Sequence, residues 1–235
     1  MKLPPVVILA GGLATRLYPM TRNIPKSMVE IAGKPFIHYQ LLMLKNGGIS
    51  DVLVCIGNLG YQIRDYVGDG SKWGIRVIYS NDSDKLLGTG GAIKKALPNL
   101  PSVFFIVYGD SYLNVDFAQV MNQFKDSNKL AILTIYHNKN NFDRSNIAFK
   151  NGEILEYSKV QSREMEYIDY GLSILNKKIF NYWPEGVAFD LGDVYKKLIL
   201  SNELCAFEAT KRFYEIGSPK GLEEFKGYIN SIHNG

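Results

Sequence analysis

Short apolar runs alternate with amphipathic segments along the chain up to residue 136. Five runs have the length and composition of buried strands, and they span 6–10, 52–56, 75–79, 103–107 and 130–136. Four segments between them carry apolar residues three and four positions apart, the spacing of an α-helix, and these span 36–45, 60–67, 90–97 and 117–124. Strands that alternate with helices in this way predict βαβ units and a mostly parallel sheet flanked by helices.

The pattern changes from residue 146 onward to shorter extended stretches. These span 147–150, 153–157, 168–175 and 205–210, and Asn151-Gly152 between the first two predicts a hairpin turn. Two further helices are predicted over 191–200 and 219–232, the second with Ser218 as its cap and Pro219 at its first position. The fold class is therefore α/β, with a smaller, partly antiparallel layer in the second half.

Composition places the chain among ordinary globular proteins. Its 235 residues are 46% hydrophobic and 21% charged, which fits a single domain over 1–235. The net charge of +4 comes from scattered Lys and Arg, so a small anionic ligand is favoured over nucleic acid or a membrane surface. No apolar stretch approaches the ~18 residues of a membrane span, and Cys55 and Cys205 lie in apolar runs as expected for free buried thiols. We expect a cytoplasmic protein.

The first predicted strand runs directly into two glycines and a short polar loop, VVILAGGLATRL from Val6 to Leu17. Gly11 and Gly12 leave main-chain N–H groups accessible to a phosphate or a base. Gly-rich turns follow many parallel strands, so these glycines alone identify no ligand. Arg16 and Lys26 change that interpretation, because two cations beside a glycine loop suit the charge of a triphosphate.

A second buried strand, 103–107, leads to Asp110. In an open α/β sheet the ligand lies beyond the carboxyl ends of the strands, so Asp110 is predicted to face the glycine loop. An aspartate that caps a loop is the ordinary alternative. Its place after a wholly apolar strand favours a metal ligand, since Mg²⁺ bound to phosphates takes one or two carboxylates.

Five motifs occur in order along the chain: LAGG-x-x-TRL, PKSM, GKP, LGTGGA and a strand followed by Gly-Asp. Together they resemble the sugar-1-phosphate nucleotidylyltransferases, and most closely the heptose-, mannose- and N-acetylmuramic-acid-1-phosphate members. The resemblance implies a Rossmann-like core. It also implies transfer of a nucleoside monophosphate from an NTP to a sugar 1-phosphate, with release of pyrophosphate.

The resemblance also implies roles for individual residues. Arg16 corresponds to the residue that holds the β and γ phosphates, Lys26 to the one that holds the α and incoming phosphates, and Asp110 completes the catalytic set. Asp110 and Glu215 are the implied Mg²⁺ ligands, although the family usually has aspartate at the second position. The implied nucleotide-binding residues are Leu9, Ala10, Gly11, Gly12, Asn81, Gly88 and Thr89.

The acceptor half matches the family less closely. The implied acceptor residues are Gly109, Lys159 and Asp169, but Lys159 lies in Ser-Lys-Val where Glu-Lys-Pro is usual, and Asp169 begins Asp-Tyr-Gly where Asn-Ala-Gly is common. Segment 143–146 replaces a glycine that usually approaches the sugar. Ala14 stands where the loop most often has a third glycine. An alanine is tolerated there if the backbone has a negative φ, and it is doubtful if φ is positive.

Several functions remain open at this stage. The first expectation is GTP with a heptose- or mannose-type phosphate, and the alternatives are UTP with an amino sugar, CTP with another phosphorylated acceptor, or a catalytically silent nucleotide-sugar sensor. Base choice is assigned to loop 81–88. A dinucleotide-dependent oxidoreductase is disfavoured because G-x-G-x-x-G is missing from the first loop. The expected partners are the NTP and the sugar phosphate, without nucleic acid or membrane, and a homo-oligomer is left open.

Overall fold

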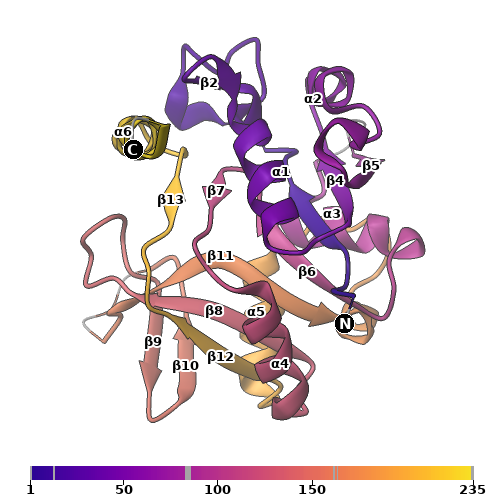
Figure 1. Ribbon diagram of the computed structural model, residues 1–235. Coiled ribbons are helices and arrows are strands. Elements are labelled where there is room, and N and C mark those ends of the chain that lie inside the picture. The colour runs from indigo at the N-terminus through magenta and orange to yellow at the C-terminus, as the bar shows by residue number, and fades with distance from the viewer. Residues whose placement is uncertain (1, 13, 83–85, 161, 163, 234–235) are drawn as a thin grey trace.

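The computed structural model describes residues 2–12, 14–82, 86–160, 162 and 164–233. Its main sheet has the order β12-β8-β11-β6-β1-β4-β5, with the β9–β10 hairpin joined to the start of β11 (Figure 1). The strands are β1 Val6–Leu9, β4 Asp51–Ile56, β5 Arg76–Asn81, β6 Val103–Tyr108, β8 Ala131–His137, β9 Ile147–Lys150, β10 Glu153–Tyr157, β11 Tyr167–Asn176 and β12 Leu204–Ala209.

The sheet has a parallel half and a mixed half. β1 lies parallel to both β4 and β6, and β4 lies parallel to β5. β11 inserts antiparallel between β6 and β8, while β8 lies parallel to β12. The predicted α/β fold, with a mostly parallel sheet and a partly antiparallel second half, is confirmed. β8 belongs to the mixed half, however, because β11 occupies the position beside β6.

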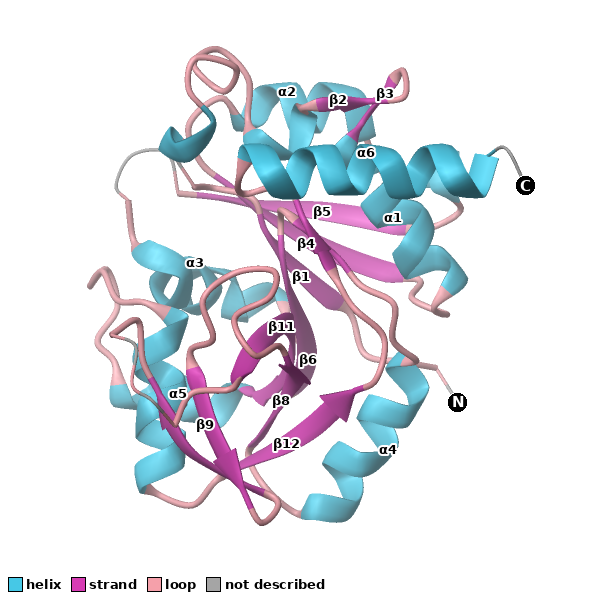
Figure 2. Cartoon of the chain, turned by 90° about the vertical axis from the view of Figure 1, so that its left-hand side faces the viewer, coloured by secondary structure: helices cyan, strands magenta, loops and turns pink. Residues whose placement is uncertain are grey.

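Six α-helices are described: α1 Phe36–Asn46, α2 Gly60–Val67, α3 Gly88–Ala96, α4 Phe117–Ser127, α5 Leu191–Leu200 and α6 Pro219–His233. Helices α1, α2 and α4 pack on one face of the sheet, and α3 and α5 pack on the other. Side chains of a strand alternate between faces, so Val6 and Ile8 of β1 join the first core and Val7 joins the second. Figure 2 shows helices flanking the sheet on both sides.

Two short antiparallel ladders bring the end of the chain back to its beginning. β7 Ser111–Tyr112 pairs with β13 Tyr214–Glu215, and β2 Glu30–Ile31 pairs with β3 Lys34–Pro35. β13 leads into α6, whose Leu222 and Phe225 pack in one apolar cluster with Ile31 of β2. Two-residue strands have no measurable period, so the sequence pattern did not predict them.

The remaining helical turns are 3-10 segments: Thr15–Leu17, Lys26–Met28, Ser71–Trp73, Leu97–Asn99 and Lys177–Tyr182. Cys55 is buried and Cys205 is partly buried, and both are free thiols. Within the described residues, no helix combines the length and apolar character that crossing a membrane requires.

Candidate active site

A cavity of about 400 Å³ opens at the carboxyl ends of β1 and β6. Leu9 of β1 pairs with Tyr108 of β6, so the residues after the two strands emerge side by side. This edge of a parallel sheet is where α/β proteins bind ligands. Nine residues that the sequence predicted for the site line the cavity, namely Leu9, Ala10, Gly11, Gly12, Lys26, Gly88, Thr89, Gly109 and Asp110.

One wall of the cavity is the start of α3, sealed by the segment before α5. Gly88 has φ +70°, and a Cβ there would lie 2.5 Å from the carbonyl oxygen of Phe189, so a side chain is excluded. The N–H groups of Gly90 and Gly91 donate to that same oxygen at 3.0 and 3.2 Å. These contacts fix the LGTGGA segment against the second half of the chain.

Thr89 also has a structural partner. Its hydroxyl oxygen accepts a hydrogen bond from the Leu191 N–H at 2.7 Å, at the first residue of α5. Asp190 caps α5 in a capping box, lines the cavity, and forms an ion pair with Lys159 at 2.9 Å. Lys159 does not line the cavity itself, and its side chain is 82% exposed. The pair places Lys159 near the rim.

Lys26 and Asp110 form an ion pair inside the site. The Lys26 Nζ lies 2.9 Å from the Asp110 Oδ2, and the two side chains are only 20% and 23% exposed. These residues are 84 positions apart in the chain and meet because the 3-10 turn of Lys26 faces the end of β6. The pair places a cation and a carboxylate at the mouth of the cavity.

The pairing of β7 with β13 brings Glu215 to Asp110. Glu215 pairs with Ser111, and the Ile216 N–H donates to the Asp110 carbonyl at 2.9 Å. A Cβ on Gly217 would lie 2.6 Å from Glu215 Oε2, 3.1 Å from Asp110 Oδ2 and 3.4 Å from Arg16 Nη2. The charged groups of Glu215, Asp110 and Arg16, all predicted for the site, therefore surround the space beside Gly217, which has no side chain to fill it.

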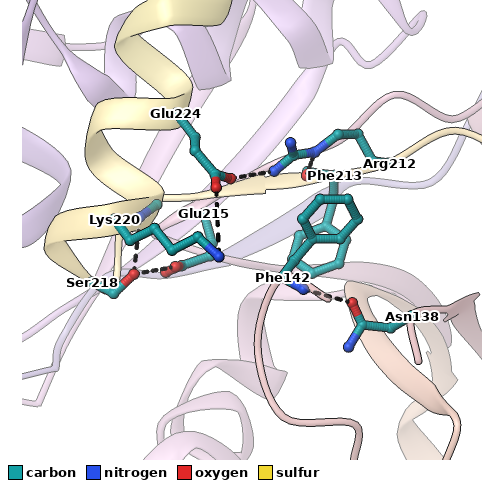
Figure 3. Close-up of polar contacts among 9 residues, drawn as sticks. Asn138, Phe142, Arg212, Phe213, Glu215, Ser218, Lys220 and Glu224 are labelled. Carbon is teal, nitrogen blue, oxygen red and sulfur yellow. Dashed lines mark hydrogen bonds and ion pairs between the residues drawn. The ribbon is translucent and has the colours of Figure 1, made fainter. Parts of the chain in front are cut away.

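The Glu215 carboxylate is held by its own turn (Figure 3). Ser218 donates from its hydroxyl at 2.7 Å. The N–H of Gly217 donates to the other carboxylate oxygen. Burial raises the pKa of Glu215; these two hydrogen bonds oppose the rise, and the nearby negative charges of Asp110 and Asp143 add to it. Two carboxylates that share one space in this way favour a bound cation.

Asp110 and Glu215 fit a magnesium site by the chemistry of their donors. Mg²⁺ prefers oxygen ligands and binds through one or two carboxylates when phosphates supply the rest. Among the described residues no group of three or more His, Cys, Asp or Glu could hold a metal. A cation here would therefore depend on a phosphorylated substrate for its further ligands.

Ala14, in the loop before Arg16, adopts a left-handed backbone with φ 53° and ψ 34°. Its carbonyl oxygen accepts from the Thr21 hydroxyl at 2.7 Å and from the Leu17 N–H at 3.2 Å. These two bonds hold an alanine in a conformation that glycine adopts more readily. The loop thus has, at Ala14, the left-handed backbone conformation that a glycine commonly adopts.

Asp169 lies behind the cavity wall and is not part of its lining. Its Oδ2 accepts from the hydroxyls of Tyr108 and Tyr157 at 3.2 and 3.0 Å, and its Oδ1 accepts from the Gly171 N–H. Burial raises the pKa of Asp169 to about 6, and the three hydrogen bonds oppose the rise. Tyr108 lines the cavity, so Asp169 reaches it through that tyrosine.

Asn81 does not line the cavity, whereas its neighbour Asp82 does. Asp82 is 7% exposed, and its Oδ1 has no hydrogen-bond partner among the described residues. Residues 83–85 of the predicted base-selecting loop lie outside the described part of the chain. The cavity residues that the sequence did not single out are Ser27, Cys55, Ala92, Tyr108 and Asp190, while Asp82, Leu86 and Leu87 belong to loop 81–88, to which base choice was assigned.

Residues 5–225 match the model of a protein family described as Nucleotidyl transferase. The chain is 30% identical to D-glycero-alpha-D-manno-heptose 1-phosphate guanylyltransferase of Campylobacter jejuni, over 93% of this chain and 97% of that protein. It is 27% identical to UTP-glucose-1-phosphate uridylyltransferase of Synechocystis sp., over 82% of this chain. It spans about half, 54%, of the length of that relative.

The fold is also found among solved structures. HddC from Yersinia pseudotuberculosis, complexed with GMP-PN, superimposes with a TM-score of 0.81 and 26% sequence identity. The match covers 97% of this chain and all of that one. The whole fold, including the mixed half of the sheet, is therefore shared with that protein.

Proposed function

This chain belongs to the nucleotidyl transferase family, among its sugar-1-phosphate nucleotidylyltransferases, and on that premise we propose that it transfers GMP from GTP to a heptose- or mannose-type 1-phosphate. Pyrophosphate is the second product. The observation that carries the proposal is the convergence of Arg16, Asp110 and Glu215 around Gly217, beside Lys26 and the glycine-lined cavity.

The reaction needs alignment and charge compensation more than acid–base chemistry. A phosphate oxygen of the acceptor attacks the α phosphorus of the NTP, and the bond from that phosphorus to the pyrophosphate oxygen breaks. The attacking phosphate is already a nucleophile, and pyrophosphate is a good leaving group once its charge is offset. No covalent enzyme intermediate is required.

The residues of the site divide this work. Main-chain N–H groups of Gly11 and Gly12 hold the nucleotide, and Arg16 offsets the charge of the β and γ phosphates. Lys26, which is paired with Asp110, aligns the α phosphate with the incoming one. Mg²⁺ bound by Asp110 and Glu215 would supply further positive charge to the phosphates.

The base is assigned to the end of the cavity formed by Gly88, Thr89 and Asp82. Asp82 lines this end of the cavity, and a carboxylate accepts from the N–H and NH2 donors of guanine, whereas uracil offers a single N–H donor. The guanylyltransferase relative and the related structure with GMP-PN support the same choice. A uridylyltransferase acting on an amino-sugar phosphate is the second candidate; the Synechocystis relative supports the choice of UTP, and its own sugar is glucose.

The acceptor is assigned to the side of the cavity that carries Gly109, Lys159 and Asp169. Lys159 supplies charge for the sugar phosphate from the rim, and Asp169 accepts from the Tyr108 hydroxyl and so holds the ring of Tyr108 in the cavity wall. This side of the site comes from the mixed half of the sheet. Residues on this side that differ from those usual in the family change which acceptor binds, and they leave the nucleotide-binding residues unaffected.

Pyrophosphate release, measured for four NTPs against a panel of sugar 1-phosphates, tests the proposal. We expect turnover with GTP and a heptose- or mannose-type phosphate, dependent on both substrates and on Mg²⁺. Faster turnover with UTP and an amino-sugar phosphate would establish the second candidate. NTP binding without pyrophosphate release for any pair would contradict both and indicate a nucleotide sensor.

A further inference from the structure

The loop between β8 and β9, residues 138–146, is organised around one amide side chain. Asn138 is fully buried, with 0% exposure. Its Oδ1 accepts from the Phe142 N–H at 3.2 Å, and its Nδ2 donates to the Asp143 carbonyl at 2.7 Å and to Ser145 at 3.2 Å. The loop therefore has one defined shape, although it lies outside the helices and strands.

This loop connects the two sides of the proposed acceptor site. At its end, Asn146 accepts from the Asp169 N–H at 2.9 Å, so the loop holds the backbone of that residue. Near its middle, the ring of Phe142 packs against the guanidinium of Arg212, which also lies over the ring of Tyr214, the residue before Glu215. A shift of the loop would change the space between Asp169 and Glu215.

Arg212 joins the loop to the strand that carries Glu215 (Figure 3). Its guanidinium carbon lies 3.9 Å from the ring centre of Phe142 in the loop. The same carbon lies 4.4 Å from the ring centre of Tyr214 in β13. Its Nη2 lies 2.6 Å from Glu224 Oε2 in α6, and its Nε donates to the Phe213 carbonyl. One side chain thus contacts the loop, β13 and α6.

The chemistry of arginine explains why this residue can serve all three contacts. A guanidinium is planar, so it stacks on aromatic rings while the N–H groups at its edge donate to a carboxylate and a carbonyl. A lysine keeps the charge but has neither the flat face nor the fork of donors. The loop contact therefore depends on the guanidinium, whereas the α6 contact depends mainly on charge.

We propose that Arg212 is a positioning residue for the phosphorylated acceptor: it fixes loop 138–146 against the strand that carries Glu215. Arg212 acts through Phe142 and not by contact with the reacting groups. The inference rests on the proposed function, because it assigns the loop to the acceptor side of the same site. An arginine that only ties α6 to β13 is the competing account.

Steady-state kinetics separate these accounts. We expect Arg212→Ala and Phe142→Leu to raise the KM for the sugar phosphate roughly tenfold with an unchanged KM for the NTP. Arg212→Lys recovers only part of the loss. The exposed neighbour Lys211 supplies the control, since Lys211→Ala removes a charge one residue away and leaves both KM values unchanged.

Glu224→Gln tests the competing account directly. It removes the charge that ties Arg212 to α6 and leaves both aromatic rings in place, so we expect a lower Tm with unchanged KM values. If Glu224→Gln raises the acceptor KM as much as Arg212→Ala does, the residue acts through α6 and the proposal is wrong. A parallel rise of both KM values in Arg212→Ala would also contradict it.

Limited trypsin digestion tests the loop without any substrate. Lys139 and Arg144 are cleavage sites within it. We expect cleavage at these sites to be several-fold faster in Arg212→Ala and Phe142→Leu than in the wild type and Lys211→Ala. Equal cleavage rates would overturn the proposal whatever the enzyme proves to transfer. A wild type without turnover would contradict the proposed function alone.

Discussion

Ala14 shows how a residue can depart from a motif while the backbone keeps its shape. The left-handed conformation costs an alanine about 1 kcal/mol, and the Thr21 hydroxyl bond to the Ala14 carbonyl helps to offset that cost. The sequence showed that a glycine was replaced. It could not show the sign of φ, which depends on the contacts of the loop with residues further along the chain.

Ala14→Gly is expected to leave the free energy of unfolding unchanged or to raise it by about 0.5 kcal/mol. Relief of the left-handed strain is nearly balanced by the larger entropy of glycine in the unfolded chain. Ala118→Gly in the exposed first turn of α4 has no strain to relieve and should destabilise by about 0.5–1 kcal/mol. Urea unfolding compares the two; an equal loss at both positions would argue against strain at Ala14.

Asp110 carries the central prediction at the residue scale. Asp110→Asn should lower turnover by a factor on the order of 100 or more, because the site loses one of its two converging carboxylates and the partner of Lys26. Its Tm should stay close to that of the wild type. The control is Asp126→Asn on the exposed face of α4, with unchanged turnover. Wild-type pyrophosphate release by Asp110→Asn would remove Asp110 from the site.

Asp169 predicts a specific dependence of stability on pH. Its pKa is about 6 in the folded protein, above the ordinary 3.8, so the folded state binds the proton more tightly than the unfolded state does. The protein should therefore lose up to about 3 kcal/mol of stability as the pH rises from 4 to 6.5, with no further loss from this group above 7.

Asp169→Asn removes this titration. Urea unfolding at pH 4.5 and 7.5 should show the variant gaining stability relative to the wild type at the higher pH. Asp126→Asn again serves as the control, because its carboxyl is exposed on α4. A difference between wild type and Asp169→Asn that is the same at both pH values would show that burial does not raise the Asp169 pKa.

At the element scale, the long strands and helices could be predicted and the short ladders could not. Helix α2 has the predicted bounds, and α1, α4 and α5 begin where their apolar patterns begin. α3 starts two residues earlier, at Gly88, because the Gly90 and Gly91 N–H groups bond to the Phe189 carbonyl. Phe189 lies about a hundred residues further along the chain, so the local periodicity around Gly88 could not indicate this contact.

The β7–β13 ladder shows what this limit means for the site. Motif spacing identified Glu215 as a candidate ligand, but only the pairing of Glu215 with Ser111 shows how it reaches Asp110. Tyr108 gave no signal of its own, since it is the last residue of the apolar strand β6, and Asp82 was included only in the general assignment of base choice to loop 81–88. Motif spacing does not identify residues that reach the site only because of the tertiary structure.

Gly217→Ala is a prediction about the turn after β13. The new Cβ would lie 2.6 Å from Glu215 Oε2 and 3.1 Å from Asp110 Oδ2, so the Glu215 carboxylate must move. We expect weaker Mg²⁺ dependence and at least tenfold lower turnover. The paired control is Gly227→Ala in α6, where a Cβ meets nothing within 4 Å and should stabilise by about 0.5–1 kcal/mol. Equal activity in the two variants would contradict the site.

At the scale of the whole molecule, the two halves of the sheet contribute different residues to the proposed site. The parallel half, β6-β1-β4-β5, supplies the glycine loop, Lys26 and Asp110, while the mixed half and the returning chain supply Asp169, Lys159 and Glu215. The residues proposed for the nucleotide follow strands in compact motifs, and most of them line the cavity, while their roles are proposals. The acceptor residues lie on hairpins and loops whose positions depend on tertiary contacts, so their roles stay proposals.

Product analysis tests the central claim most directly. GTP, a heptose- or mannose-type 1-phosphate and Mg²⁺ are incubated with the purified protein, and mass spectrometry with a pyrophosphate assay follows both products. The account predicts a GDP-sugar formed in equal amount to pyrophosphate, with neither product when the sugar phosphate is omitted or Asp110→Asn replaces the wild type. Pyrophosphate formed with free GMP, or GTP bound with no product from any sugar phosphate, would contradict it.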